Sequence, residues 1–291
     1  MYTTLISVEQ LQALHTGGAP LMVFDCSFDL AQPLAGRAMY TESHIAGAVY
    51  ADLNTDLSAK GEPLTTGAQS GGRHPLPSRE KFASWLQSVG FDNTMQAVVY
   101  DRQGVNYCGR LWWMLKWLGH DVVAVLDGGL QAWVAAGGAQ ASGAAVPSAS
   151  PSATPFSVST ARVTLLGADT VLSHLGRPGQ SIVDARATPR FKGEVEPLDP
   201  VAGHIPGAFN RPFTQNLTPQ GFFKPASVLR AEFEALLGTQ SAQHVVHHCG
   251  SGVSAIPNLL GMEVAGLGGS ALFAGSWSEW CSDPTRPVAK G

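Results

Sequence analysis

Residues 245–254, VVHHCGSGVS, are the stretch of sequence that decides the fold. The apolar start predicts a short strand, and the glycines after Cys249 predict a tight turn that points several N–H groups inward. Ser254 is a good N-cap and Pro257 suits a first helical turn, so a helix is expected to begin near Ser254 or Ala255. Short strands that alternate with helices predict parallel pairing in an α/β layered domain.

Cys249 is expected to be reactive because of this position. The loop amides and the positive end of the helix favour the charged thiolate and should lower the pKa of the thiol. A thiolate is the nucleophile that covalent catalysis requires. A small buried core thiol is the alternative interpretation of a lone cysteine.

The two halves of the chain repeat the same landmarks in the same order. Residues 42–48, ESHIAGA, match residues 202–208, AGHIPGA, and residues 126–133, LDGGLQAW, match residues 273–280, FAGSWSEW. Short apolar runs precede and separate these motifs, at residues 21–25, 97–101, 181–184 and 245–248. Such a series indicates a duplicated domain, in which each copy has a mainly parallel sheet flanked by helices.

One copy lacks the nucleophile. At the same offset along the chain, Asp101 stands in the place of Cys249, and Asn106 stands in the place of Ser254. The first copy therefore keeps the loop and a helix cap but has no thiol there. We predict that one copy is catalytic and that the other is structural or shapes the substrate site.

The domain boundaries follow from a change in composition. Residues 138–155 are mostly small residues and proline, without charge or apolar periodicity, which is typical of a linker. We predict an N-terminal domain over residues 1–137, a linker over residues 138–156 and a C-terminal catalytic domain over residues 157–291.

Composition limits the partners and the compartment. The formal net charge of −4 over 291 residues argues against nucleic acid or an anionic membrane surface as the main partner. No secretory signal or membrane span is visible, so the four scattered cysteines are expected to be free thiols in a reducing cytoplasm.

Three other interpretations of the motifs are weaker. Cysteine phosphatases need an arginine six residues after the cysteine, where this chain has Ala255. A zinc site at residues 247–249 fails because successive strand residues point to opposite faces. Residues 266–270, GLGGS, lie between a helix and a strand, which is the wrong order for a dinucleotide-binding fingerprint.

The chain resembles the tandem rhodanese family, and the mercaptopyruvate sulfurtransferases within it most closely. The resemblance rests on residues 249–254, CGSGVS, residues 203–208, GHIPGA, and residues 275–280, GSWSEW. Residues 184–186, DAR, and residues 190–193, RFKG, extend it. It covers nearly the whole chain and implies two tandem rhodanese-like domains.

The resemblance also implies roles for individual residues. Cys249 would carry sulfur as a persulfide, and Ser251 with His74, in the motif GRHPLP, would assist proton movement. The substrate carboxylate would be held by Arg190, with Arg186 nearby. The remaining residues of the loop would contact the substrate: Gly250, Gly252, Val253 and Ser254.

Two positions depart from the pattern of the family. Ser254 replaces the usual threonine but keeps a hydroxyl group. Leu198 stands where better-known members have a second substrate-binding arginine, which weakens the assignment of the donor.

The expected activity is the transfer of sulfane sulfur from a small anionic donor, 3-mercaptopyruvate, without a cofactor or a metal. The acceptor would be a thiol, thioredoxin or cyanide. A thiosulfate sulfurtransferase that uses cyanide is the main alternative. A non-enzymatic sulfur-binding module is a further one, against which the retained Cys249 argues.

Overall fold

The chain forms two compact units in a computed structural model that describes residues 1–62, 70–143 and 154–291. The first unit contains residues 1–59, 77–162 and 219–222, and the second contains residues 60–76, 163–218 and 223–291. Each unit includes a short segment from the other half of the sequence. Residues 60–76 matter most, because they bring His74 into the second unit.

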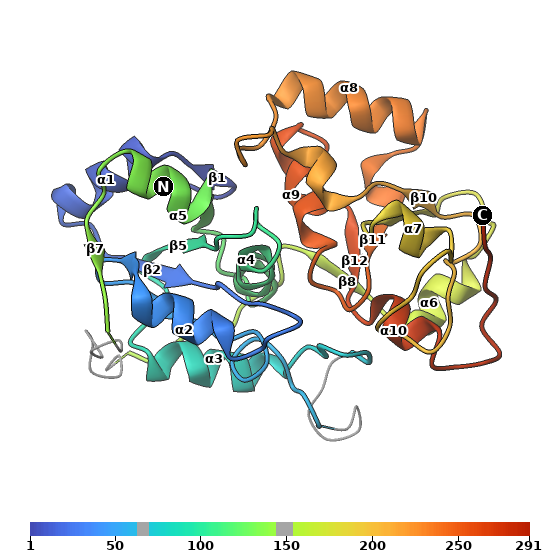
Figure 1. The fold of residues 1–291 in the computed structure, drawn as a ribbon, viewed down its shortest axis with the longest axis horizontal. Helices are drawn as coiled ribbons and strands as arrows, with labels where there is room; N and C mark the ends of the chain where they lie inside the picture. The colour runs from blue at the N-terminus through green and yellow to red at the C-terminus, as the bar shows by residue number, and fades with distance from the viewer. Residues whose placement is uncertain (63–69, 144–153) are drawn as a thin grey trace. The chain divides into compact units, whose positions relative to one another are not determined.

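A five-stranded parallel sheet forms the centre of the first unit (Figure 1). Its strands, in spatial order, are β1 (Leu5–Ile6), β6 (Val123–Leu126), β5 (Gln96–Tyr100), β2 (Leu21–Asp25) and β4 (Val49–Tyr50). Its helices are α1 (Val8–Gly17), α2 (Ala35–Glu42), α3 (Arg79–Ser88), α4 (Cys108–Trp117) and α5 (Gly129–Ala135). Side chains that alternate along the strands bury both faces of the sheet.

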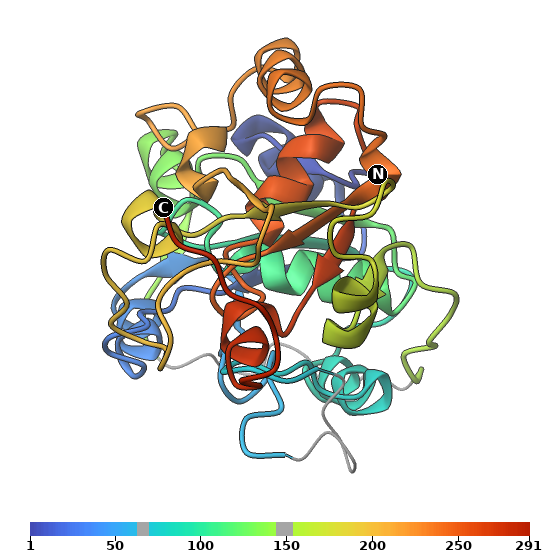
Figure 2. The same ribbon diagram turned by 90° about the vertical axis from the view of Figure 1, so that its right-hand side faces the viewer.

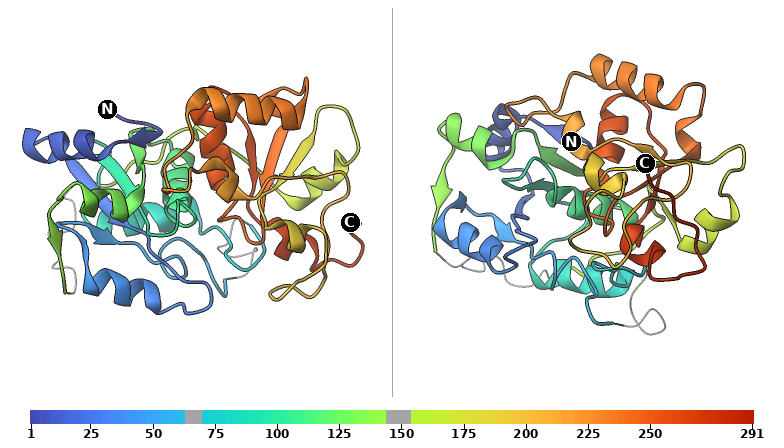
Figure 3. Two further views of the ribbon diagram at one scale, coloured as in Figure 1. Left: turned by 45° about the horizontal axis from the view of Figure 1, so that its top comes forward. Right: turned by 45° about the vertical axis from the view of Figure 1, so that its right-hand side comes forward.

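The faces of this sheet are covered by different helices (Figures 1 and 3). Val23 and Val98 pack with residues of α1 and α5 in one core cluster. On the opposite face, Phe24 contacts the ring of Trp85 from α3. The strand residues alternate between the two faces, as a period of two requires.

Residues at both ends of the predicted linker pack within the first unit. Strand β7 (Gln140–Ala141) pairs antiparallel with β3 (His44–Ile45), so the first unit continues past residue 137. After residue 153, Phe156 is buried and stacks on Phe91. Only residues 144–153 of the predicted linker lie outside the described residues.

The second unit repeats the architecture of the first. Its parallel strands, in spatial order, are β10 (Phe209–Asn210), β9 (Ser181–Asp184), β11 (Val245–His248), β12 (Ala271–Phe273) and β8 (Thr164–Leu166). Its helices are α6 (Ala168–Ser173), α7 (Thr188–Phe191), α8 (Ala226–Leu237), α9 (Ile256–Val264) and α10 (Ser276–Trp280), with 3-10 turns η1 (Phe213–Asn216) and η2 (Ala242–His244). Helices α8 and α9 lie on one side of the sheet, and α6 and α10 lie on the other (Figures 1 and 2). The predicted α/β class with two parallel-sheet domains is confirmed.

The duplication is visible in matching contacts. The indole N–H of Trp133 donates to the Ala139 carbonyl at 2.9 Å, and that of Trp280 donates to the Pro287 carbonyl at the same distance. Each unit thus uses one tryptophan in the same way to fix the chain that follows its last helix.

The predicted helix caps are wrong in both copies. Helix α9 begins at Ile256, after Ala255, and α4 begins at Cys108, after Tyr107, and neither of the preceding residues makes a capping side-chain bond. In the first copy the N–H groups of Tyr107 and Cys108 donate to the Asp101 carboxylate instead, at 2.8 and 3.0 Å. That carboxylate satisfies the start of the helix, so a cap at Asn106 is not needed.

Across residues 1–62, 70–143 and 154–291, no helix is both long and apolar enough to span a bilayer. Within the same ranges, His, Cys, Asp and Glu side chains do not gather in threes in a way that could hold a metal ion.

Candidate active site

Cys249 directly follows β11, at the carboxyl end of the central strand of the second sheet. Its N–H donates to Ser276 Oγ at 3.0 Å, and its carbonyl accepts from the Trp277 N–H at 3.0 Å. The next carbonyl, that of Gly250, accepts from the Ser278 N–H at 2.9 Å. Helix α10 therefore fixes the backbone on which the thiol stands, and the residue is only 2% exposed.

Gly252 makes the tight turn of this loop possible. Its φ of +74° lies in the left-handed region, and a Cβ there would lie 2.0 Å from the Ala274 carbonyl oxygen. No other residue fits this position without moving the backbone of the loop.

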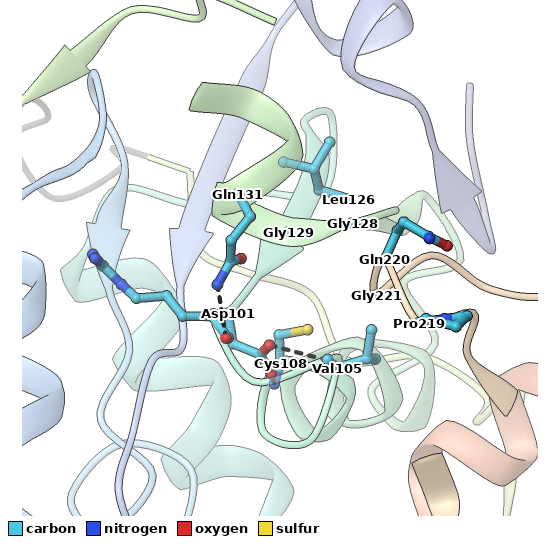
Figure 4. A pocket seen from close by; sticks show the side chains of 12 residues that line it. Asp101, Val105, Cys108, Leu126, Gly128, Gly129, Gln131, Pro219, Gln220 and Gly221 are labelled. Carbon is cyan, nitrogen blue, oxygen red and sulfur yellow. Dashed lines mark hydrogen bonds between the residues drawn. The ribbon is translucent and has the colours of Figure 1, made fainter. Parts of the chain in front are cut away.

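The equivalent loop of the first unit shows what such a loop binds. The Asp101 carboxylate accepts hydrogen bonds from the N–H groups of four residues that follow it, at 2.8–3.0 Å: Gln103, Val105, Tyr107 and Cys108. Figure 4 shows Asp101 with Val105 and Cys108 beside it. The loop therefore converges on a negative charge at the position that Cys249 occupies in the second copy. In the described part of the second unit, the amides of Gly250, Ser251 and Val253 donate to no protein acceptor.

The structure brings His74 and Ser251 together. His74 Nδ1 lies 2.8 Å from Ser251 Oγ, within hydrogen-bond distance, and both residues are buried. The sequence places these residues far apart, and the contact forms because residues 60–76 belong to the second unit.

Two arginines stand beside the residue that follows Cys249. A Cβ built on Gly250 would lie 2.9 Å from Arg73 Nη2 and 3.5 Å from Arg190 Nη1. Arg73 was not predicted from the sequence, although it directly precedes His74.

Acidic residues balance these guanidinium groups. Arg190 donates to Glu196 at 2.6 Å and to Asp199 at 3.3 Å, and Arg73 forms an ion pair with Asp199. Burial opposes ionisation of Glu196, but the hydrogen bond from Arg190 and the neighbouring backbone amides outweigh it and lower the pKa of its carboxyl group. Each arginine uses part of its guanidinium group on an acid and leaves another nitrogen facing Gly250.

Arg186 is more deeply buried than Arg73 and Arg190, and its guanidinium group already has hydrogen-bond partners. Its Nη2 donates to Asp184 Oδ2 and to the Gly203 carbonyl, both at 2.7 Å, and its guanidinium lies 4.6 Å from the Trp277 ring centroid. Its side chain is 2% exposed. The guanidinium group of Arg186 is therefore paired with the acidic side chains of Asp184 and Glu196 in this structure.

The histidines before Cys249 point to different partners. His247 Nε2 lies 3.1 Å from the Met262 sulfur, and burial, with the charges of His248 and Arg211, lowers the pKa of His247 to about 3. His248 Nε2 lies 3.5 Å from Asp184 Oδ2. His247 is therefore a neutral core residue at neutral pH.

Cys26, Cys108 and Cys281 are also free thiols, and all three are buried. Burial, followed by the charge of Asp101 at Cys108 and of Asp25 at Cys26, raises the pKa of both thiols well above the ordinary value. A cavity of about 190 Å³ borders Cys108 in the first unit (Figure 4). Because thiolates are the reactive form, these sites are poorly suited to nucleophilic chemistry.

Comparison with known proteins identifies the family of this chain. The model of the rhodanese-like domain matches residues 7–136 and 167–283. The chain is 46% identical over 288 residues to the "Probable 3-mercaptopyruvate sulfurtransferase" of Pseudomonas aeruginosa, covering 99% of this chain and 98% of the relative. It is 33% identical over 288 residues to the thiosulfate sulfurtransferase of Bos taurus, covering 96% and 92%.

A solved structure agrees with this result. The 3-mercaptopyruvate sulfurtransferase from Leishmania major matches with a TM-score of 0.79 at 29% identity, covering 97% of this chain and 75% of that one. With both units matched by the domain model and with relatives aligned over almost the whole length, the chain belongs to the rhodanese family.

Proposed function

We propose that this protein is a sulfurtransferase that takes sulfane sulfur from 3-mercaptopyruvate and passes it to a thiophilic acceptor through a persulfide on Cys249. The observation that carries the proposal is the arrangement around the Cys249 loop. Ser251 of this loop pairs with His74, at 2.8 Å from Nδ1 to Oγ, and two guanidinium groups lie beside Gly250.

The proposed reaction has two displacements. In the first, the Cys249 thiolate attacks the donor sulfur, so that an S–S bond forms, the C–S bond breaks and the electron pair stays on carbon as the enolate of pyruvate. The donor's thiol proton is transferred to that carbon, and pyruvate leaves. In the second, an acceptor nucleophile attacks the outer sulfur and restores the Cys249 thiolate.

Residues of the loop would stabilise the charge that develops. Ser251, paired with His74, can donate a hydrogen bond to the enolate oxygen and relay the proton. Arg190 and Arg73 can hold the substrate carboxylate through the nitrogens that face Gly250. The loop amides, which surround a carboxylate in the first copy, would stabilise the persulfide anion.

The charge balance favours a keto acid over thiosulfate. Arg73 and Arg190 are opposed by Asp199 and Glu196, so this group of four side chains has no net charge. Gly250 adds no cation. A dianionic donor would need more positive charge than a monoanionic carboxylate does.

The acceptor and the compartment are part of the same proposal. A small thiol, thioredoxin or cyanide would remove the persulfide sulfur. Four free thiols among the described residues fit a reducing compartment, and we place the protein in the cytoplasm.

The test is a comparison of donors on one enzyme preparation. Catalytic efficiencies are measured for mercaptopyruvate and thiosulfate with one acceptor, and donor-treated protein is analysed by mass spectrometry. The proposal requires a higher efficiency for mercaptopyruvate and one added sulfur on the Cys249 peptide. Equal or better use of thiosulfate would show that mercaptopyruvate is not the preferred donor. Sulfur on another cysteine would disprove the mechanism.

A further inference from the structure

Helix α10 contacts the segment that carries His74. We call residues 70–76 the His74 segment. The Gly71 N–H donates to Glu279 Oε2 at 3.2 Å, and the Arg73 N–H donates to Ser278 Oγ at 3.1 Å. These bonds lie on the N-terminal side of His74, and one of them is to the residue directly before it.

The same short helix also holds the nucleophile. Ser276 accepts from the Cys249 N–H, Trp277 donates to the Cys249 carbonyl, and Ser278 donates to the Gly250 carbonyl. Thus Ser278 bonds to both segments, through its N–H on one side and its hydroxyl on the other. Cys249 and His74, which are distant in sequence, are positioned by adjacent residues of one element.

The fit between α10 and the His74 segment is close. A Cβ on Gly71 would lie 2.8 Å from Glu279 Cδ. A Cβ on Gly72, whose φ is +86°, would lie 2.5 Å from the Gly275 carbonyl oxygen and 2.6 Å from Ser278 Oγ. The segment therefore needs glycine at both places to lie at hydrogen-bond distance from the helix.

Glu279 is well suited to hold a backbone amide. Its side chain folds back over Gly275, where an added Cβ would lie 1.4 Å from Oε2, and it is only partly exposed. A carboxylate that accepts from an N–H group forms a charge-assisted bond, which is stronger than a neutral one.

We propose that Glu279 and Ser278 are positioning residues that hold the His74 segment so that the imidazole lies against Ser251. They act through the backbone of Gly71 and Arg73 and touch neither substrate nor sulfur. The inference rests on the proposed function, because it assigns His74 a part in proton transfer.

The main test compares Glu279→Ala with Glu279→Gln in the full-length protein. The alanine variant loses the acceptor for the Gly71 N–H and is expected to lower kcat about tenfold or more, with little change in KM. The glutamine variant keeps an acceptor oxygen and should retain most of the wild-type kcat. Ser278→Ala should lower kcat as well, and it should also raise KM because Ser278 holds the backbone of Arg73. Glu234→Ala, at an exposed site on α8, is the matched control.

A double-mutant cycle with His74→Ala separates positioning from a general loss of stability. If Glu279 acts through His74, the combined variant should be no slower than His74→Ala alone. Additive losses, or a glutamine variant as slow as the alanine variant, would overturn the proposal.

Hydrogen exchange gives a readout that does not depend on the reaction. The amides of the His74 segment should exchange faster in Glu279→Ala, while alkylation of Cys249 by iodoacetamide keeps its wild-type rate. Unchanged exchange, or faster exchange with unchanged kcat, would refute the positioning role. A wild-type protein without mercaptopyruvate turnover would refute the proposed function. Hydrogen exchange would then still test whether Glu279 holds the His74 segment.

Discussion

Arg102 and Arg186 perform the same structural task from different places in the repeat. Arg102 pairs with Asp25 and donates to the Ser43 carbonyl, whereas Arg186 pairs with Asp184 and donates to the Gly203 carbonyl. Each carbonyl directly precedes the histidine of the HI-containing motif. In both units a guanidinium group thus ties the end of the second strand to that motif.

Arg186→Ala should therefore reduce stability. It would leave the buried Asp184 carboxylate without its guanidinium partner, and breaking a buried ion pair typically costs about 3–5 kcal/mol. Denaturant unfolding measures the loss. A variant with wild-type stability and a raised KM would instead support the expected role of Arg186 in substrate binding.

The loss in Arg186→Ala should depend on pH. Burial favours the neutral form of Asp184, yet the neighbouring His248 and Arg186 keep the pKa of its carboxyl group lowered in the wild type. A lowered folded pKa adds stability above the unfolded pKa of about 3.9, and that contribution disappears as the pH falls through the folded value. Without Arg186, burial should raise this pKa, so the difference in stability should be largest near neutral pH and should shrink toward pH ~4. A constant difference would argue against this origin.

Replacement of Cys249 by serine should abolish sulfur transfer. An alcohol keeps its proton near neutral pH and cannot carry sulfur as a persulfide. The measurement is turnover together with the mass of donor-treated protein. Cys281→Ser, at another buried thiol of the second unit, is the control and should remain active. Residual activity of Cys249→Ser with sulfur on Cys26, Cys108 or Cys281 would disprove the mechanism.

His74→Ala should lower kcat more than it raises KM. Its Nδ1 is 2.8 Å from Ser251 Oγ, and proton transfer by a positioned group typically contributes about 10²-fold or more. Steady-state kinetics with mercaptopyruvate measures both constants. An effect on KM alone would make His74 a binding residue.

Asp101→Ala should convert the first loop into a site for an added anion. The variant leaves four N–H groups without their acceptor, which should lower stability by about 2 kcal/mol or more. Sulfate should then raise the melting temperature of the variant more than that of the wild type. Equal responses to sulfate would show that the loop does not hold an anion by itself.

The features predicted from sequence are those that local patterns encode. The strands at residues 21–25, 181–184 and 245–248 were correct because short apolar runs between glycine loops are local signals. The Cys249 loop was located for the same reason. Local signals also misled, since Ser254 and Asn106 have the side chains of helix caps but the helices begin beyond them.

The remaining features depend on contacts between distant residues. Arg73 pairs with Asp199, which lies far from it in the sequence, and no local pattern near Arg73 predicts that pair. Arg186 lies in the motif from which a binding residue was expected, but its pairing with the buried Asp184 and Glu196 depends on the fold and could not be predicted from the sequence. Residues 60–76 belong to the second unit for the same reason, because contacts with residues distant in sequence decide where they pack.

Asp199→Asn should shift the donor preference toward thiosulfate. Asp199 pairs with both Arg73 and Arg190, so an amide of the same shape adds one net positive charge beside Gly250 without removing a side chain. A dianion gains more from that charge than a carboxylate does, and one charge-assisted contact is worth about 1.5–3 kcal/mol, so the efficiency ratio of thiosulfate to mercaptopyruvate should rise about tenfold. Glu234→Gln, which neutralises an exposed carboxylate on α8, is the control for the change in total charge. An unchanged ratio in Asp199→Asn would mean that the balance between these arginines and acids does not select the donor, and the selection would then lie in the shape of the loop around Ser251.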